Sequence, residues 1–253
     1  MIEYVDLARA KESIAIRIVV AGVLPSPWSE ATKGLLRVAK LPAVAVRSMP
    51  GDREAATWTG VDNVPVVLHG KEPARTAASA IVALVARLAP DAGLVPHDLA
   101  GRADVMGLVE LIAGEDGLGW NERLAMIHVG IASNGARGFP QPIATRLAKR
   151  YGYVDASFER VRERFTAQLA HLSARLAGRD YFGGDRPNAV DIYTATFLTP
   201  LVPLADADCP GFVSVAKQGF TAAAEEFGPL VPAELKALRA RMFERHLAWP
   251  IEL

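Results

Sequence analysis

One candidate for chemistry is a serine in a turn-like segment that follows the first apolar run and precedes a helical pattern. The segment reads Pro25-Ser26-Pro27-Trp28-Ser29-Glu30. Unpaired N–H groups and the positive end of the helix dipole favour an anion or a thiolate beside Ser26. The alternative interpretation is a plain helix start, in which Ser26 or Ser29 caps the helix, Pro27 occupies its first turn and Glu30 offsets the dipole.

A second unusual position is a proline at the start of an apolar segment, Asn63-Val64-Pro65-Val66. A proline removes one hydrogen bond from a strand ladder, so we expect a special backbone geometry at Val64 and Pro65.

The clearest local pattern is Asn188-Ala189-Val190-Asp191 after a Gly/Pro-rich turn. The Asn188 side chain is placed to accept a backbone N–H of the helix that follows, while Asp191 reaches back to the N–H of Asn188, which is a capping box. This pattern predicts a structural role, and losing either side chain should cost about 1 kcal/mol, or more if the helix starts inside the core.

Other candidates are weaker. The single cysteine, Cys209, has no partner, and the histidines show no metal-ligand spacing, so no zinc site is expected. No Gly-x-Ser-x-Gly sequence marks a hydrolase nucleophile. The run that contains Glu115, Asp116, Trp120, Asn121 and Glu122 is a pocket lining or, more commonly for such a run, a solvated turn with one packed tryptophan.

These residues must be positioned by two different kinds of structure. Apolar, β-branched runs at 17–22, 43–47 and 64–68 predict buried strands, and three- and four-residue periodicity after the serine turn and after Thr76 predicts helices between and behind them. Alternation of this kind makes an α/β layer whose first crossover returns parallel to the first strand. The turn-rich segment 89–96 predicts a linker between domains 1–90 and 91–253.

The second domain should be all helix. Its amphipathic patterns cover, in order, residues 99–113, 120–131, 140–151, 155–178, 188–205 and 232–248.

Composition limits the function. The 253 residues carry 28 basic and 28 acidic side chains, and this balance argues against a nucleic-acid partner or an anionic membrane surface. The apolar runs are too short to cross a bilayer. An acidic N-terminal segment unlike a signal peptide, together with the lone cysteine, favours the cytoplasm.

Taken together, the serine turn, Val64-Pro65 and the Asn188–Asp191 box resemble the cytosolic glutathione transferase family along nearly the whole chain. The resemblance implies a thioredoxin-like α/β domain followed by an all-α helical bundle, with Val64-Pro65 at the family's cis-proline. It also implies a homodimer.

The resemblance further implies a site for glutathione as cosubstrate. Ser26 is then the hydroxyl that donates a hydrogen bond to the glutathione thiolate, and Trp28 lies beside the same ligand. Backbone groups of Val64, before Pro65, would pair with the cysteinyl amide. Leu24, Trp28 and Trp120 would line a pocket for an apolar electrophile between the domains.

One departure concerns the acid–serine pair with which the family holds the γ-glutamyl group. Ala77 and Ala78 stand at those positions here. Thr76 and Ser79 are candidate substitutes as helix-terminal donors, with Arg75 adding positive charge.

Two functions therefore remain open. The first is an enzyme that uses the glutathione thiolate on a hydrophobic electrophile. The second is a non-catalytic module of the same fold that binds a ligand or a protein. Thiol–disulfide exchange by the protein itself is excluded, since no cysteine stands at the Ser26 position.

Overall fold

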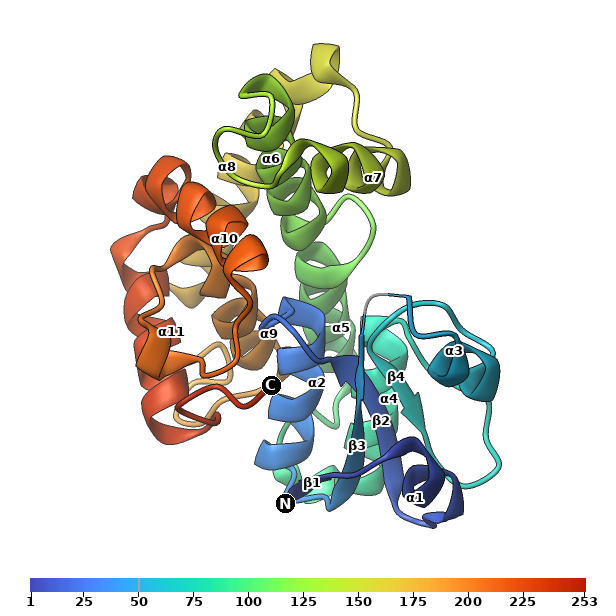
Figure 1. The fold of residues 1–253 in the computed structure, drawn as a ribbon. Coiled ribbons are helices and arrows are strands. Elements are labelled where there is room, and N and C mark those ends of the chain that lie inside the picture. Colours follow the sequence, from blue (N-terminus) through green and yellow to red (C-terminus); the bar gives the residue numbers. More distant parts are fainter. Residues whose placement is uncertain (50) are drawn as a thin grey trace.

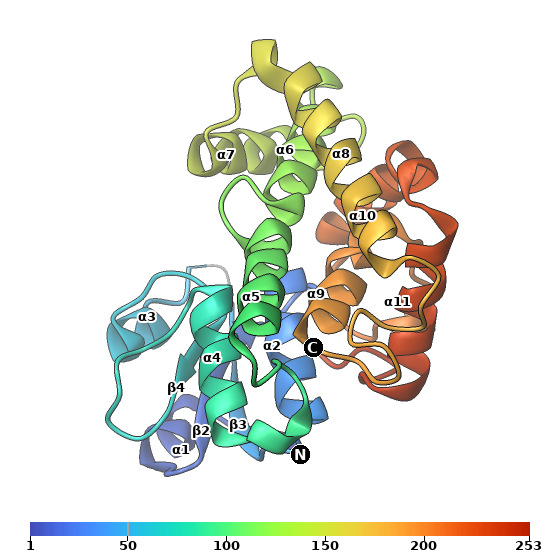
Figure 2. The ribbon, with the colours of Figure 1, turned by 180° about the vertical axis from the view of Figure 1, so that it is seen from behind.

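The computed structural model describes residues 1–49 and 51–253, which form a small sheet-containing half beside a larger helical half (Figures 1 and 2). The sheet has four strands in the order β1-β3-β2-β4. Their bounds are β1 (Ile2–Tyr4), β2 (Ile16–Ala21), β3 (Ala43–Ser48) and β4 (Val66–Leu68). As expected, β3 returns parallel to β2, whereas β4 runs antiparallel to β2.

Helices cover both faces of this sheet. They are α1 (Leu7–Glu12), α2 (Pro27–Val38), α3 (Arg53–Thr59) and α4 (Ala78–Leu88). Alternate residues of each strand face opposite ways. Ile18 and Ala45 thus join the core under α2 and α4, while the neighbouring Val19 and Val44 pack toward α3 and α1. The sequence patterns predicted β2, β3, β4, α2 and α4 but missed β1, α1 and α3.

All α-helices beyond residue 98 belong to the helical half. They are α5 (Leu99–Ala113), α6 (Leu118–Ala132), α7 (Gln141–Tyr151), α8 (Phe158–Leu176), α9 (Ala189–Phe197), α10 (Ser214–Glu226) and α11 (Ala233–Arg245). The predicted helix at 188–205 ends as an α-helix at Phe197, and α10 was not predicted. This arrangement is the expected thioredoxin-like sheet domain with a helical bundle. The position of the domain boundary, at residues 89–96, stays a prediction.

The capping box forms as predicted. The Asn188 side chain accepts from the N–H of Val190 at 2.8 Å, and the Asp191 carboxylate accepts from the N–H groups of Asn188 and Phe182 at 2.8 Å each. Helix α9 is buried along its whole length and packs directly against α2. The contact is so close that a Cβ on Gly34 of α2 would lie 2.8 Å from the side chains of Ile192 and Leu247.

The end of the chain returns to the sheet half, and Figure 1 shows both termini on the same side of the molecule. The Tyr4 hydroxyl donates to the carbonyl of Glu252 at 3.1 Å, and the Arg47 Nε donates to the carbonyl of Leu253 at 2.6 Å. Lys33 of α2 also donates to the Glu252 carbonyl. Within the described residues, no helix combines the length and the apolar character needed to cross a bilayer.

Candidate functional site

The turn after β2 contains a serine, Ser26, whose hydroxyl has no hydrogen-bond partner among the described residues. Ser26 occupies the N-cap position of α2 with extended backbone angles, but its side chain makes no capping hydrogen bond. Ser29 does not cap the helix either, because its hydroxyl accepts the N–H of Ala21 at 3.1 Å and so ties α2 to β2. The expectation that one of the two serine side chains caps the helix is therefore wrong, whereas Pro27 and Glu30 do occupy the first turn as that interpretation placed them.

Sheet register brings the proline segment to the same turn. Val66 pairs with Val19 in the antiparallel β2–β4 ladder, and continuing this register places Val64 opposite Ala21, where the serine turn begins. The Val64–Pro65 peptide bond is cis, as the resemblance implied. Among the described residues, the backbone N–H and C=O of Val64 have no hydrogen-bond partner.

The start of α4 also reaches this end of the sheet. Arg75 forms a backbone bridge with Val67 of β4, so the chain that leads into α4 runs back alongside the proline segment. Ala77 is the N-cap of α4 and provides no side-chain acceptor for its first N–H groups. Thr76 and Ser79 are half-buried there, and neither hydroxyl bonds to the described part of the chain.

Arg75 is less available than its position suggested. Its guanidinium is paired with Glu72, which also accepts from Arg87 at 2.7 Å and from His69 at 2.8 Å. The hydrogen bonds from Arg87, His69 and Arg75 lower the pKa of Glu72 to about 2, so this carboxylate is ionised at neutral pH. Because the Arg75 guanidinium is paired with the Glu72 carboxylate, it offers less positive charge to a ligand.

Trp28 joins the two halves of the molecule. Its indole N–H donates to the carbonyl of Ala113 at the end of α5, at 2.9 Å. Its ring meets Phe197 of α9 edge-on, with centroids 4.7 Å apart. Gly119 of α6 permits this packing, because a Cβ there would lie 2.2 Å from Phe197 and 3.2 Å from Trp28.

Trp120, which follows Gly119 in α6, belongs to the helical half. Its ring packs on Tyr151 at the end of α7, with centroids 4.8 Å apart. The neighbouring Arg150 donates to the Asn63 side chain at 2.8 Å, which ties α7 to the proline segment. Leu24, in the turn itself, is half-buried against the main core. The predicted pocket residues thus come from both halves of the molecule, and neither of the two cavities described below is lined by Leu24, Trp28 or Trp120.

The acidic run before and within α6 divides into exposed and buried residues. Glu115 and Asp116 are exposed, whereas Asn121 and Glu122 are 1% and 2% exposed. Asn121 donates to the carbonyls of Asp116 and Gly117 at 2.8 and 2.9 Å, so its role is structural. Burial raises the pKa of Glu122 to about 8. The solvated-turn interpretation is therefore wrong for the second part of this run.

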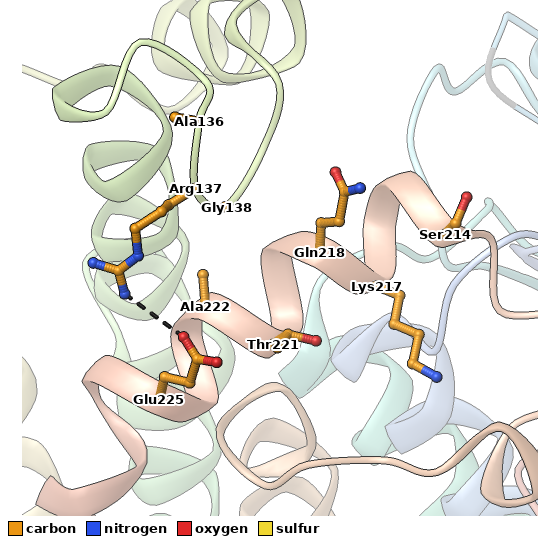
Figure 3. A pocket seen from close by; sticks show the side chains of 9 residues that line it. All are labelled: Ala136, Arg137, Gly138, Ser214, Lys217, Gln218, Thr221, Ala222 and Glu225. Atoms are coloured by element: carbon orange, nitrogen blue, oxygen red, sulfur yellow. Dashed lines mark ion pairs between the residues drawn. The ribbon is translucent and has the colours of Figure 1, made fainter.

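A groove lined by several polar side chains lies next to the turn that follows β2 (Figure 3). The sequence patterns did not predict this groove because they did not predict α10. The groove has a volume of about 470 Å³ between α10 and the loop joining α6 to α7. Val213, just before α10, donates to the carbonyl of Val23 at 3.1 Å, which fixes this end of α10 on the turn. Figure 3 shows Arg137 reaching across the groove toward Glu225, with their charged atoms 3.7 Å apart.

In the part of the chain that the structure describes, no group of three or more His, Cys, Asp or Glu side chains is placed to hold a metal ion.

Comparisons with known proteins concern the fold and the helical half of the molecule. Residues 155–229 match the family model of the glutathione S-transferase C-terminal domain. No curated protein sequence matches.

Solved structures match nearly the whole chain. A glutathione transferase family member from Pseudomonas fluorescens, solved with two glutathione bound, is 18% identical with a TM-score of 0.62, over 94% of this chain and 93% of that one. A glutathione S-transferase from Methylobacterium radiotolerans in complex with glutathione sulfonate is 20% identical with a TM-score of 0.57, over 91% of each chain. A maleyl pyruvate isomerase, described as a bacterial glutathione S-transferase of the Zeta class, is 18% identical with a TM-score of 0.54, over 90% and 92%. At these identities the likeness concerns the fold.

Proposed function

We propose that this chain, whose residues 155–229 match the glutathione S-transferase C-terminal domain and whose fold is that of glutathione transferases, binds glutathione beside Ser26 and transfers the thiolate to a hydrophobic electrophile. The supporting observation is the Ser26 hydroxyl at the N-terminus of α2, which makes no capping hydrogen bond and has no partner in the part of the chain that the structure describes. A free thiol has a pKa near 8.5, so most glutathione is unreactive at neutral pH. A donated hydrogen bond and a helix N-terminus both favour the thiolate.

The proposal assigns the rest of glutathione to neighbouring backbone. The unpaired N–H and C=O of Val64 suit the cysteinyl amide, in the manner of a short added strand. The uncapped start of α4, with Thr76 and Ser79, suits the γ-glutamyl carboxylate in place of the absent acid–serine pair. Arg75 contributes less charge than its position suggests because Glu72 neutralises it.

The electrophile is proposed to bind between the halves, with Leu24, Trp28 and Trp120 as the apolar side chains that it contacts. The reaction forms a carbon–sulfur bond while the leaving group departs with the electron pair. Neither the serine nor any other protein side chain acts as the nucleophile. A homodimer and a cytoplasmic location complete the proposal, on the basis of the family resemblance.

The test is calorimetric titration with glutathione combined with turnover of 1-chloro-2,4-dinitrobenzene, for the wild type and for Ser26→Ala. We expect micromolar-to-millimolar binding, similar in both proteins, and a rate at pH 6.5 at least tenfold lower in the variant. The pKa of the bound thiol, read from thiolate absorbance, should rise in the variant. Ser13→Ala is the matched control, since Ser13 precedes β2, at the opposite end of that strand from Ser26, and within the described residues its hydroxyl accepts only the N–H of Ala15.

Absence of both heat and turnover would reject the proposal. It would favour the alternative, a non-catalytic ligand-binding or protein-interaction module, for which the alanines at positions 77 and 78 are the supporting observation. Binding with unchanged rates in Ser26→Ala would keep the ligand but remove the serine from its assigned role.

A further inference from the structure

A second cavity lies at the boundary between the halves, and none of the residues assigned to glutathione lines it. It has a volume of about 500 Å³, within the usual range of small-molecule sites. One wall is the face of α2 that carries Glu30, Lys33 and Arg37, together with β1. The other wall is formed by α9, α11 and the tail that follows α11.

The polar groups inside this cavity are already paired. Lys33 and Glu30 form an ion pair at 2.8 Å and are almost completely buried, with 10% and 6% of their side chains exposed. Lys33 also donates to the Tyr4 hydroxyl at 3.2 Å and to the Glu252 carbonyl. The two interior charges therefore cancel, and the depth of the cavity offers no net charge to a ligand.

The mouth of the cavity is different, because it carries unpaired cations. Arg37 and Lys40, at the end of α2 and just beyond it, are exposed and line the cavity. In the described part of the chain neither side chain has an ion-pair or hydrogen-bond partner. The Glu252 carboxylate is the opposing side-chain charge at the same mouth, so the side chains of Arg37, Lys40 and Glu252 together leave one net positive charge there.

Apolar side chains supply most of the remaining lining. They come from both halves of the molecule: Ile2, Leu41, Phe243, Leu247 and Ala248. A ligand that fits this arrangement has an apolar body for the interior and a single anionic group for the mouth. An apolar body recovers the favourable free energy of leaving water, while the anionic group stays near Arg37 and Lys40 at the solvent boundary.

We propose that this cavity is a binding site for an amphipathic carboxylate, such as a medium-chain fatty acid, separate from the glutathione site. The carboxylate lies between Arg37 and Lys40, and the hydrocarbon chain lies between α2 and the α11 end of the helical half. The site spans the boundary between the halves, so an occupant contacts both of them.

The test is calorimetric titration with octanoate, with 1-octanol as the uncharged counterpart. We expect one saturable site per chain for octanoate and much weaker binding of 1-octanol. The double variant Arg37→Gln, Lys40→Gln should bind octanoate on the order of tenfold more weakly. The matched control is Lys11→Gln, Arg160→Gln, which removes the same two charge types at exposed positions outside the cavity and should bind like the wild type.

Glu252→Gln gives the opposite prediction. Lys33 contacts the backbone carbonyl of Glu252, so this variant removes only the opposing charge, and octanoate should bind a few-fold more tightly. Saturating glutathione should not displace octanoate, whether or not glutathione itself binds.

Three results would overturn the site. They are no octanoate binding by the wild type, equal affinity in the double variant and its control, and displacement of octanoate by glutathione.

Discussion

Replacing Glu122 with glutamine is expected to stabilise the protein by an amount that grows with pH. The carboxyl group is 2% exposed, and its Oε1 atom has no hydrogen-bond partner within the described residues. Burial raises its pKa from 4.5 to about 8, although the charge of Arg123 acts in the opposite direction. The folded state therefore holds the proton in a pH range in which the unfolded chain releases it.

The direction and size of the effect on the free energy of unfolding follow from this difference in pKa between the folded and unfolded states. As pH rises from 4.5 to 8, the unfolded state gains stability by ionising while the folded state does not, so the free energy of unfolding of the wild type falls. At about 1.4 kcal/mol per pKa unit, a shift from 4.5 to about 8 corresponds to up to about 5 kcal/mol. Glutamine has nearly the same shape and does not titrate, so the variant lacks this loss.

The assay is urea denaturation followed by tryptophan fluorescence at several pH values between 4 and 9. The quantity to plot is the free energy of unfolding of Glu122→Gln minus that of the wild type, because other titrating groups cancel in this difference. It should be near zero at pH 4 and rise steadily to a plateau above pH 8. Glu115→Gln, the same substitution in the exposed part of the run, is the matched control variant. A flat difference for Glu122→Gln itself would refute the reasoning.

Three further variants test the packing and the site. Asp191→Ala leaves two buried backbone N–H groups without their acceptor and should lower the free energy of unfolding by about 3 kcal/mol, measured with urea; a loss below 1 kcal/mol would contradict the assigned role of the capping box. Gly34→Val places a side chain where a Cβ already lies 2.8 Å from two neighbours, so the melting temperature should fall by an amount equivalent to about 1 to 3 kcal/mol, and an unchanged melting temperature would contradict the close α2–α9 contact. Arg150→Ala removes an exposed hydrogen bond to Asn63 and should change stability by less than about 1 kcal/mol; a larger loss in a thermal melt would mean that α7 is held to the proline segment more strongly than this one contact explains.

The sequence predicted those elements whose side chains carry a strong periodic signal. Strands β2 and β3 are runs of β-branched and small apolar residues, buried on both faces by helices, and α8 keeps a regular apolar stripe. The capping box was predictable because its two hydrogen bonds join residues three positions apart or fewer.

The missed elements lack that signal. Helix α10 buries mainly small residues, among them Ala216, Gly219 and Ala223, whose apolar contribution to a periodic pattern is slight. It packs because a large partner fills the space: a Cβ on Gly219 would lie 2.4 Å from the ring of Phe139. Strand β1 and helices α1 and α3 are 3, 6 and 7 residues long, too short to establish a period.

The candidate site was predictable in its backbone and much less so in its side chains. Ser26 and Pro65 could be placed from the turn and the strand that they adjoin. The orientation of Trp28 depends on Ala113, 85 positions away, and no local pattern contains that information. The pairing of Arg75 with Glu72 is local, but a salt bridge in a turn has no periodic signature.

The burial of α2 has a consequence for how the molecule unfolds. Every residue from Ser29 to Leu36 is buried, which means that the helix has the sheet on one side and α9 and the chain end on the other. A helix that is buried on all sides packs into the core of the sheet half with one face and into the core of the helical half with the other. Separating the halves would expose its outer face to water, so the sheet half and the helical half should lose structure in one cooperative transition. Any ligand that binds to either half should then protect amide protons from exchange in both.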